Sequence, residues 1–344
     1  MRISVIIPCY NAAGTLGECL AAVARERRSG APIAEVIVVD DASTDGSRQI
    51  AAGAEGVRLL ALERNGGDCA ARNAGARAAT GEILWFLDAD VTAAPGSARI
   101  VAEFLTDRAD VDAVIGSYDD RPAAAGFCSQ YRNLLHHYVH QRQGPSVSTF
   151  WTGCGAVRRA AFERLGGFDD SFWPGAPIAD MEFGYRLRRG GGRIALRHDL
   201  LVRHHKRWTL GSIVRTDLFG RAIPWTVLLQ RYPELGRGEL NLGWREKGAV
   251  ASVAAGLAAG AAACAAAVFA RGVGLPLMLP ASGCALFAVM LHAPILAFLQ
   301  EKKGIRFALG SLLLLLIYDA TCAVGYLAGR VCHALGYKPR RKSA

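Results

Sequence analysis

Residues 85–91 read WFLDADV, an apolar run that ends in two carboxylates separated by one alanine. The run continues the apolar segment EILWFLD (82–88), which has the length and composition of a buried strand. Asp88 closes the segment and Asp90 follows it. The pattern therefore predicts a strand that leaves the core at its carboxyl end and presents two acids there.

Four other short apolar runs have the same character and alternate with longer amphipathic stretches. They are ISVIIP (3–8), EVIVVD (35–40), VRLLAL (57–62) and VDAVIGS (111–117). Near-continuous apolar strands separated by helices predict an α/β fold with a mostly parallel sheet covered on both faces. Ligands of such sheets bind at the carboxyl ends of the strands. Asp40 and Asp41 end one run and Asp88 another, so we expect these acids to face one crevice.

The overall composition allows a globular enzyme and favours an anionic partner. The 344 residues are ample for a core, and 40 Lys and Arg outnumber 30 Asp and Glu, with much of the excess beyond residue 180. Phosphate, a lipid surface and nucleic acid all fit this charge. Nine cysteines without zinc-site spacing indicate reduced thiols. The apolar run before Pro8 is too short for a signal peptide, so the N-terminal part is expected in the cytoplasm.

Three apolar stretches in the C-terminal third are long enough to cross a bilayer as helices. Residues 249–270 and 272–299 contain no charged side chain, and 307–329 contains one, Asp319. The first stretch is rich in alanine, so a buried or interfacial helix is the alternative there. An acid inside a span costs free energy unless it is paired or hydrated. Asp319 is therefore either paired within a helix bundle or functional.

The topology of these stretches is not settled by their charges. The segment QEKKGIR (300–306) fits a cytoplasmic loop by the positive-inside rule. Three full crossings would then place the basic tail YKPRRKSA on the opposite side. Either the tail breaks the rule or one stretch is re-entrant.

Arg, Lys and Trp interleave with apolar residues at roughly helical spacing in the segment 204–235. This is the composition of a helix in the lipid headgroup plane, although a helix packed on the first domain has a similar pattern. We divide the chain into four predicted parts, which are a catalytic domain (1–205), an interfacial segment (206–248), a transmembrane region of about three helices (249–335) and a basic tail (336–344).

Asp88 and Asp90 have the spacing of a metal-binding pair. Two carboxylates at a strand end can hold a divalent cation that also binds a diphosphate, and their hard oxygen ligands suit Mg²⁺ or Mn²⁺. Alone the pattern is weak, because D-A-D also occurs in surface turns.

Further motifs accompany this pair along the chain. In order they are SVIIPCYN (4–11), VVDDASTDGS (38–47), NGGDCAARNAG (65–75), FLDAD (86–90), GCGAVRRAAFERLGGFDDSF (153–172) and DMEFGYRLRRGG (180–191). Over roughly residues 1–215 the sequence resembles the family 2 glycosyltransferases, as a membrane-anchored member. The resemblance implies a GT-A type fold, a nucleotide-diphospho-sugar donor, a divalent metal and inversion at the anomeric carbon.

The resemblance also implies a donor site. Asp41 matches the family aspartate that accepts a hydrogen bond from the nucleotide base, and Pro8 and Tyr10 would line the same pocket. Arg72 would face the donor or stabilise the acidic crevice, and Asp88 would act through water or the donor's sugar. Turn chemistry at strand ends and a solvated helix arginine are the structural alternatives.

A metal site is implied at Asp90, with His204 as a second ligand. The ion would neutralise the charge on the departing nucleoside diphosphate, so that no general acid is needed. The histidine assignment could slip by one, to His205. An ordinary helix face is expected for three histidines without an accompanying acid, His136, His137 and His140.

Asp180 is our candidate for the general base that takes the proton of an acceptor hydroxyl. Family members commonly carry a Glu-Asp pair before a helix, with an Arg six residues later. Here the matching residues are Ala179, Asp180 and Arg186, so the sequence departs from the pattern at the first position. Asp180 could instead cap the helix, and Glu182 is the fallback base.

We therefore predict a multi-pass membrane glycosyltransferase with a cytoplasmic catalytic domain, which transfers one sugar to a lipid-linked or membrane-proximal glycan acceptor. A processive polysaccharide synthase is the first alternative, but QRYPE (230–234) does not match its Q-x-x-R-W signature. A non-catalytic membrane scaffold is the second. Nucleic-acid binding is disfavoured, because the basic residues lie beside apolar stretches and the crevice is acidic. The sugar, the nucleotide base and the oligomeric state stay open.

Overall fold

The computed structural model describes the chain except residues 170, 176, 235–239, 270–273, 338 and 340–344, and except the side chains of 241, 267–269 and 274–278. The chain forms two compact units, Met1–Trp208 and Thr209–Tyr337, which are described separately.

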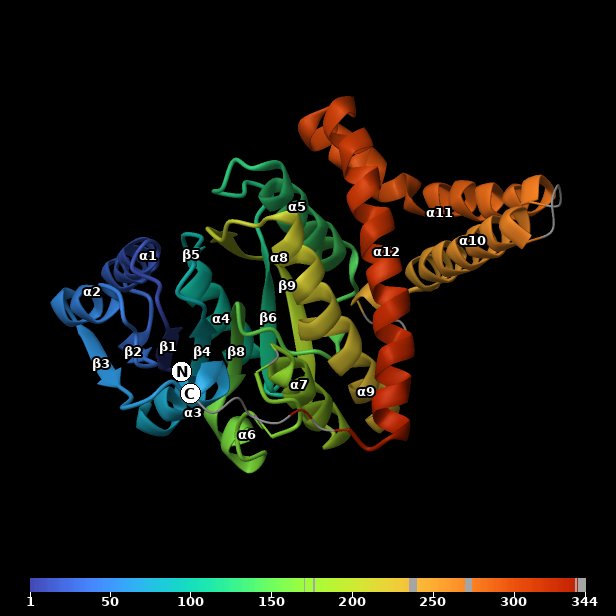
Figure 1. Cartoon of the computed structure of the whole chain (residues 1–344). Coiled ribbons are helices and arrows are strands. Elements are labelled where there is room, and N and C mark those ends of the chain that lie inside the picture. Colours follow the sequence, from blue (N-terminus) through green and yellow to red (C-terminus); the bar gives the residue numbers. More distant parts are fainter. Residues whose placement is uncertain (170, 176, 235–239, 270–273, 338, 340–344) are drawn as a thin grey trace. The chain divides into compact units, whose positions relative to one another are not determined.

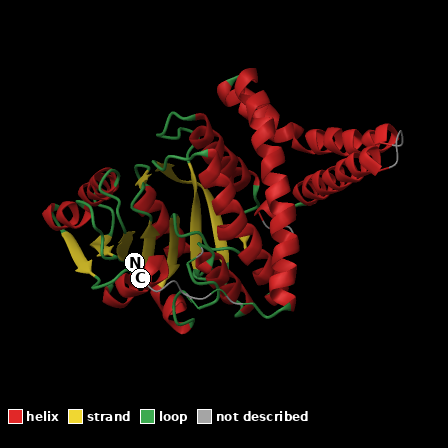
Figure 2. Cartoon of the chain, in the orientation of Figure 1, coloured by secondary structure: helices red, strands yellow, loops and turns green. Residues whose placement is uncertain are grey.

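The first unit contains one mixed sheet and seven helices within its described residues (Figures 1 and 2). The strands are β1 (Ile3–Cys9), β2 (Ile33–Asp40), β3 (Val57–Ala61), β4 (Ile83–Leu87), β5 (Val91–Ala93), β6 (Ala113–Tyr118), β7 (Ser146–Val147), β8 (Cys154–Arg158) and β9 (Ile194–His204). The helices are α1 (Leu16–Arg28), α2 (Ser47–Gly53), α3 (Gly67–Ala78), α4 (Ser97–Asp107), α5 (Phe127–Arg142), α6 (Arg159–Arg164) and α7 (Ala179–Arg189).

The sheet has the order β3-β2-β1-β4-β8-β6-β9-β5, with β7 beside β9. Strands β1 to β4 are parallel, which confirms the mostly parallel sheet predicted from the apolar runs. β1 lies between β2 and β4, so the connections reverse direction at β1. A crevice at the carboxyl ends of the strands forms at such a point in open α/β sheets.

Three antiparallel strands depart from a purely parallel sheet. β8 lies between β4 and β6, while β5 and β7 pair with β9. The segment VTAAPG (91–96) does not lead directly into a helix, because Val91–Ala93 first pairs with the end of β9. α4 starts only after Gly96, which has φ +85°. A three-residue strand is defined by a distant partner and has no periodicity of its own.

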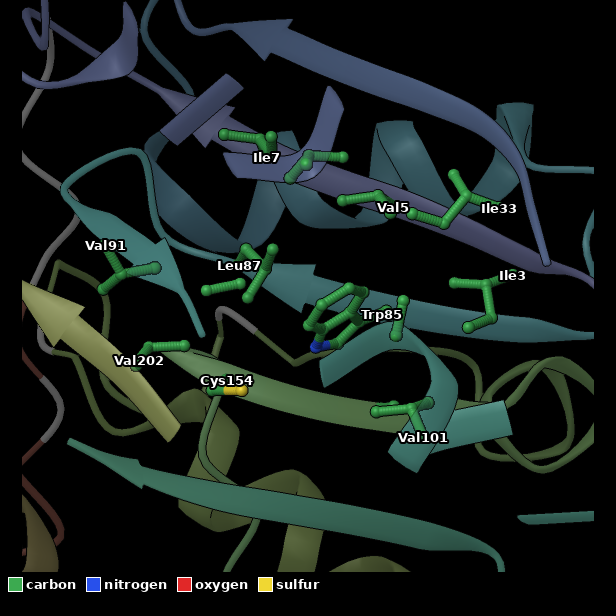
Figure 3. Close-up of a cluster of buried hydrophobic side chains, with 14 of the residues drawn as sticks. Ile3, Val5, Ile7, Ile33, Trp85, Leu87, Val91, Val101, Cys154 and Val202 are labelled. Atoms are coloured by element: carbon green, nitrogen blue, oxygen red, sulfur yellow. The ribbon is translucent and has the colours of Figure 1, made fainter. Parts of the chain in front are cut away.

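The apolar residues Trp85, Phe86 and Leu87 lie in β4, at the centre of the sheet. Their side chains alternate, so that Trp85 and Leu87 pack on the face covered by α1 and α4, while Phe86 packs on the face covered by α3, α6 and α7. Figure 3 shows Trp85 and Leu87 among residues of β1, β2 and α4. Both faces are therefore buried, and β4 can leave the core only at its ends.

The second unit is helical within its described residues. Its elements are α8 (Leu210–Arg215), a π-helix η1 (Thr216–Ala222), α9 (Ile223–Arg231), a short 3₁₀ turn η2 (Leu240–Leu242), α10 (Trp244–Phe269), α11 (Gly274–Lys303) and α12 (Ile305–Ala334). Three helical segments are long and apolar enough to cross a membrane, namely Trp244–Ala266, Leu279–Lys303 and Ile305–Ala334.

Asp319, the acid within the last apolar stretch, is paired. His292 Nε2 of α11 and Asp319 Oδ2 of α12 lie 2.6 Å apart, and both side chains are almost fully buried. The structure therefore shows Asp319 paired within the helices of the second unit.

Candidate active site

The carboxyl ends of β1, β2 and β4 gather the predicted donor-site residues at one edge of the sheet. β1 ends at Cys9, β2 at Asp40 and β4 at Leu87, and these strands are neighbours. Pro8 is partly buried in β1, and Tyr10 just beyond it is 51% exposed. An aromatic side chain with this exposure at a strand end is open to stacking by a ligand.

Asp41 clamps the loop between β3 and α3. Its side chain is 2% exposed, and its two carboxylate oxygens accept hydrogen bonds from the backbone N–H groups of Gly66 (2.7 Å) and Gly67 (2.8 Å). Gly67 has φ +82°, a conformation that disfavours any other residue there. The glycines thus serve first to receive Asp41. Its contact with a nucleotide base stays a prediction.

The loops after β1 and β2 are fastened to each other. Asn11 has φ +51°, and its Oδ1 accepts a hydrogen bond from the backbone N–H of Thr44 at 2.8 Å. The N–H of Ala12 donates to Ser47 Oγ at 2.8 Å. These contacts hold the ends of two neighbouring strands in one arrangement. The motifs SVIIPCYN and VVDDASTDGS therefore act as one structural piece.

Asp88 forms an ion pair with Arg72 of α3. Arg72 Nη2 lies 2.7 Å from Asp88 Oδ1, and the arginine is buried. Burial alone would lower the pKa of Arg72, but the charges of Asp88 and Asp68 outweigh it and raise that pKa, so the guanidinium stays charged. The alternative of a solvated helix arginine is excluded by this burial. The structure thus brings a cation next to the acid that ends β4.

Asp180 lies in the same electrostatic neighbourhood. Burial raises the pKa of its carboxyl to about 6, although the charge of Arg72 and hydrogen bonds from Thr152 and Met181 act in the opposite direction. Thr152 donates from its N–H (3.4 Å) and its Oγ1 (3.3 Å) to Asp180 Oδ2. A carboxylate with a pKa close to neutrality is suited to exchange protons at physiological pH.

Asp180 does not cap α7. The helix begins at Ala179, its capping position is Ile178, and Asp180 falls inside the first turn, where its Oδ1 accepts from the N–H of Met181 at 2.8 Å. Ala179 is buried, so the position where the family commonly has Glu is apolar and enclosed here.

Asp90 and His204, the two predicted metal ligands, lie close together. The pairing of β5 with β9 places Val91 opposite His204, and His204 Nε2 lies 3.5 Å from Asp90 Oδ2. Burial would raise the pKa of Asp90, but the hydrogen bond from His204 and the charge of Lys206 lower it below its usual value. His205 is engaged elsewhere, 2.6 Å from Thr92 Oγ1.

Tyr118 was missed by the sequence analysis. Its ring stacks on the imidazole of His204 with centroids 4.4 Å apart and an interplanar angle of 10°. Burial raises the pKa of its phenol, and the nearby charges of Asp90 and Asp88 raise it further. Tyr118 is the last residue of β6. The only signal in the sequence was that it follows a predicted strand of the same sheet as the strands that end in Asp41 and Asp88.

The histidines of α5 form an aromatic cluster beneath Tyr118. His136 packs on Tyr118 (4.6 Å between ring centroids) and on Trp151 (5.0 Å), while His140 Nδ1 lies 3.0 Å from the carbonyl of Gly116. Burial lowers the pKa of His140 to about 4, and that of His136 also falls. Both rings are therefore neutral and pack as core aromatics. They support Tyr118 as structural residues of the helix and are not arranged as metal ligands.

Glu182 is buried and locked into a separate ion pair. Both of its carboxylate oxygens accept from Arg186 Nε, at 2.9 and 2.8 Å. Arg186 also donates to the carbonyls of Leu165 (2.6 Å) and Gly167 (2.7 Å). This network ties α7 to the turn after α6, so Glu182 is not available as a base.

Asp90 and His204 fit a divalent ion that takes some of its ligands from the bound donor substrate. Asp90 supplies an oxygen and His204 a nitrogen, and a nitrogen donor suits a first-row ion such as Mn²⁺ better than Mg²⁺. Among the described residues, no group of three or more His, Cys, Asp and Glu side chains is arranged to hold a metal. A bound ion would therefore need further ligands from phosphates and water.

Comparison with known proteins gives the family that the sequence resembles and the fold. Residues 4–166 match the family described as glycosyl transferase family 2. The match covers just under half of the chain, and these residues resemble that family. The mannosyltransferase PcManGT from Pyrobaculum calidifontis, solved in complex with GDP-Man and Mn²⁺, aligns over 95% of this chain and 87% of its own, with a TM-score of 0.59 and 21% identity. That likeness confirms the predicted GT-A type fold.

Two curated proteins have sequences similar to that of this chain. Validoxylamine A glucosyltransferase from Streptomyces hygroscopicus subsp. jinggangensis is 31% identical over 222 residues, covering 55% of this chain and 52% of the relative. Undecaprenyl-phosphate 4-deoxy-4-formamido-L-arabinose transferase from Aeromonas hydrophila is 31% identical over 168 residues, covering 47% and 51%. The chain thus spans about half the length of both relatives.

Proposed function

We propose that the protein is an inverting glycosyltransferase that moves one sugar from a nucleotide-diphospho-sugar to an acceptor at the membrane. The observation that carries the proposal is the gathering of Arg72, Asp88 and Asp180 beside the Asp90–His204 pair, at the carboxyl ends of the central strands. The match of residues 4–166 to glycosyl transferase family 2 favours this reaction class.

The donor would lie over the ends of β1, β2 and β4. Tyr10 offers an exposed ring for the base, with Pro8 beside it, and Asp41 fixes the loop that leads to Arg72. Arg72 contributes a positive charge next to the diphosphate. Its ion pair with Asp88 keeps the guanidinium in place before the donor arrives.

Asp90 and His204 are the residues that would hold the metal. A divalent ion bound there supplies Lewis acidity that offsets negative charge on the departing nucleoside diphosphate. Asp88 is turned towards Arg72, so we assign it to contacts with water or with the donor's sugar. The PcManGT complex contains Mn²⁺, which supports the choice of ion.

Asp180 is the proposed base for a hydroxyl acceptor. Its pKa of about 6 leaves it mostly ionised at pH 7 and still basic enough to take a proton. Thr152 orients one carboxylate oxygen, and the other accepts from Met181. If the acceptor is a lipid phosphate, the attacking oxygen is already ionised and the base matters less. The Aeromonas relative is named for transfer to undecaprenyl phosphate, which supports this second acceptor class.

The test is to incubate the purified full chain with Mn²⁺ and a panel of nucleotide sugars, and to measure released nucleoside diphosphate and the shift in melting temperature. We expect one donor to bind only with metal. Asp180→Asn should abolish transfer to a hydroxyl acceptor and spare transfer to a polyprenyl phosphate. The exposed Glu163→Gln is the matched control. If no donor binds in the presence of Mn²⁺ or Mg²⁺, the proposal fails.

The two alternatives give different results in the same assay. A processive synthase would extend the acceptor by many sugars, whereas single transfer yields one product mass. A non-catalytic scaffold would release no diphosphate from any donor. The retained Asp90, Asp180 and Arg72 favour catalysis, because a scaffold has no need for a buried arginine between two acids.

A further inference from the structure

The second unit contains two differently packed sets of long helices. α10 and α11 lie side by side as a hairpin, and in Figure 1 this hairpin runs transverse to α12. The arms approach closely, since a Cβ on Gly248 would lie 3.0 Å from Leu291 and one on Gly256 would lie 3.2 Å from Cys284. Between Gly248 and the tip, and back to Leu291, the sequence carries a charge only at Arg271. Each arm of roughly 20 residues is about 30 Å long, which matches the hydrocarbon core of a bilayer.

α12 contacts α11 and α10, and it also packs along η1 and α9. A methyl group on Gly325 would overlap Ala222, and one on Gly329 would lie 2.6 Å from the Cβ of Thr226. Both contacts advance by four residues in the same direction along the two helices. α12 and α9 therefore run side by side with their backbones in close approach, as small residues permit.

Because α12 packs against η1 and α9, its tilt relative to the membrane must match the tilt of these charged helices. η1 and α9, with the end of α8, carry Arg215, Asp217, Arg221 and Arg231 within 17 residues, too many for a helix that crosses hydrocarbon. Exposed Phe219 gives the same segment an apolar side, so its composition is that of an interfacial helix. Two helices packed side by side share one direction, so α12 cannot stand upright while α9 lies flat.

Charge at both ends of α12 leads to the same conclusion. Lys302, Lys303 and Arg306 flank its start, while Arg330 and the basic residues of the tail flank its end. Basic residues accumulate on the cytoplasmic side of a membrane. A crossing helix would place one of these clusters on the wrong side, whereas a helix lying in the plane keeps both on the same side.

The polar pair of this unit, His292 and Asp319, lies near the open end of the hairpin formed by α10 and α11. His292, bonded to Asp319, directly follows Leu291, which contacts Gly248 at the start of the α10 arm. Pro294 lies two residues further along α11. The ionisable groups are thus at the base of the hairpin, where an interface would be, and not midway along its arms.

We propose that α12 lies in the membrane plane with an apolar stripe in the boundary between headgroups and acyl chains, and that only α10 and α11 cross. The stripe contains Leu309 (63% exposed) and Leu327 (65% exposed), each followed four residues later on the same side by an exposed residue, Leu313 and Val331. The opposite side buries Asp319, Gly325 and Gly329. Two crossings return the chain, so the basic tail lies on the same side as the first unit. This inference does not depend on glycosyl transfer.

Depth measurements on the full chain in phosphatidylcholine–phosphatidylglycerol vesicles test the proposal. Spin labels attached singly through a genetically encoded ketone side chain at Leu309 and Leu316 of α12, and at Leu286 of α11, leave the native cysteines untouched. We expect equal, shallow depths at 309 and 316 and a deep label at 286. A crossing α12 would place position 316 about 10 Å deeper than 309, at 1.5 Å per residue, and would overturn the proposal. Strong spin–spin broadening at both α12 positions would also overturn it, because the stripe would then contact a second copy.

The side of the tail gives an independent measurement that needs no substitution. Epitope tags at the two termini are digested in right-side-out and in inverted vesicles. Two crossings predict that both tags are cut in the same preparation. Cleavage of the two tags in opposite preparations would mean an odd number of crossings and would refute the in-plane helix.

Discussion

Replacing Asp180 by asparagine should stabilise the protein while it abolishes transfer to a hydroxyl acceptor. Burial raises the pKa of Asp180 from 3.8 to about 6. The folded chain therefore binds this proton more tightly than the unfolded chain, and ionisation of Asp180 opposes folding. The contribution to the unfolding free energy falls as the pH rises from about 4 to about 6 and stays low above that range. The pKa shift of roughly two units corresponds to a change of up to about 3 kcal/mol in the unfolding free energy.

The assay is chemical unfolding of the two proteins at pH 4.5 and pH 7.5, without donor or metal. We expect Asp180→Asn to be more stable than the parent by about 3 kcal/mol at pH 7.5 and by only about 1 kcal/mol at pH 4.5, where the folded carboxyl is still mostly protonated. Glu163→Gln, at an exposed carboxylate, should change neither value. Equal stability of Asp180→Asn and parent at pH 7.5 would refute the raised pKa and the burial argument behind it.

The same titration should govern catalysis. With a hydroxyl acceptor, kcat/KM of the parent should rise with pH and level off above about pH 7, because the base acts only when ionised. At pH 5, one unit below the pKa of about 6, roughly a tenth of Asp180 is ionised, so about a tenfold loss is expected. A flat profile between pH 5 and pH 7 would remove Asp180 from the role of base.

Three further substitutions separate the roles of neighbouring residues. Asp90→Ala should abolish Mn²⁺-dependent donor binding, measured by calorimetry, with an unchanged circular dichroism spectrum; unchanged affinity would move the metal elsewhere. Tyr118→Leu should raise the Mn²⁺ concentration needed for half-maximal activity by about tenfold through loss of the stack on His204, while Tyr118→Phe restores the parent value; equal behaviour of the two variants would contradict a positioning role. Glu182→Ala should lower the unfolding free energy by up to about 3 kcal/mol, because it leaves the partly buried Arg186 without its counter-charge; a loss below 1 kcal/mol would contradict that pairing.

The fold was predictable where burial itself leaves a mark in the sequence. The five apolar runs correspond to β1, β2, β3, β4 and β6. Four of these strands are largely buried and need continuous apolar residues, while the edge strand β3 is only partly buried. The antiparallel members were harder to predict. β8 is the five residues CGAVR, and β5 is the three residues VTA. Their strand conformation follows from partners at least 40 residues away, which no local window contains.

The candidate site was predictable at strand ends and not beyond them. Asp41, Asp88 and Asp90 follow apolar runs, so their location at one edge follows from sheet geometry. The roles of Tyr118 and of the Glu182–Arg186 pair depended on packing between distant elements. Periodicity also says little about what a polar side chain contacts.

The clamp at Asp41 has a consequence for the thermodynamics of donor binding. Because Asp41 already holds Gly66 and Gly67 through their N–H groups, the loop is ordered before any nucleotide arrives. Binding then loses little conformational entropy, of the order of 1 to 2 kcal/mol for each residue that would otherwise have to be fixed. A protein with a loosened clamp could keep every direct contact to its donor and still bind it weakly, with a more unfavourable entropy as the only trace of the defect.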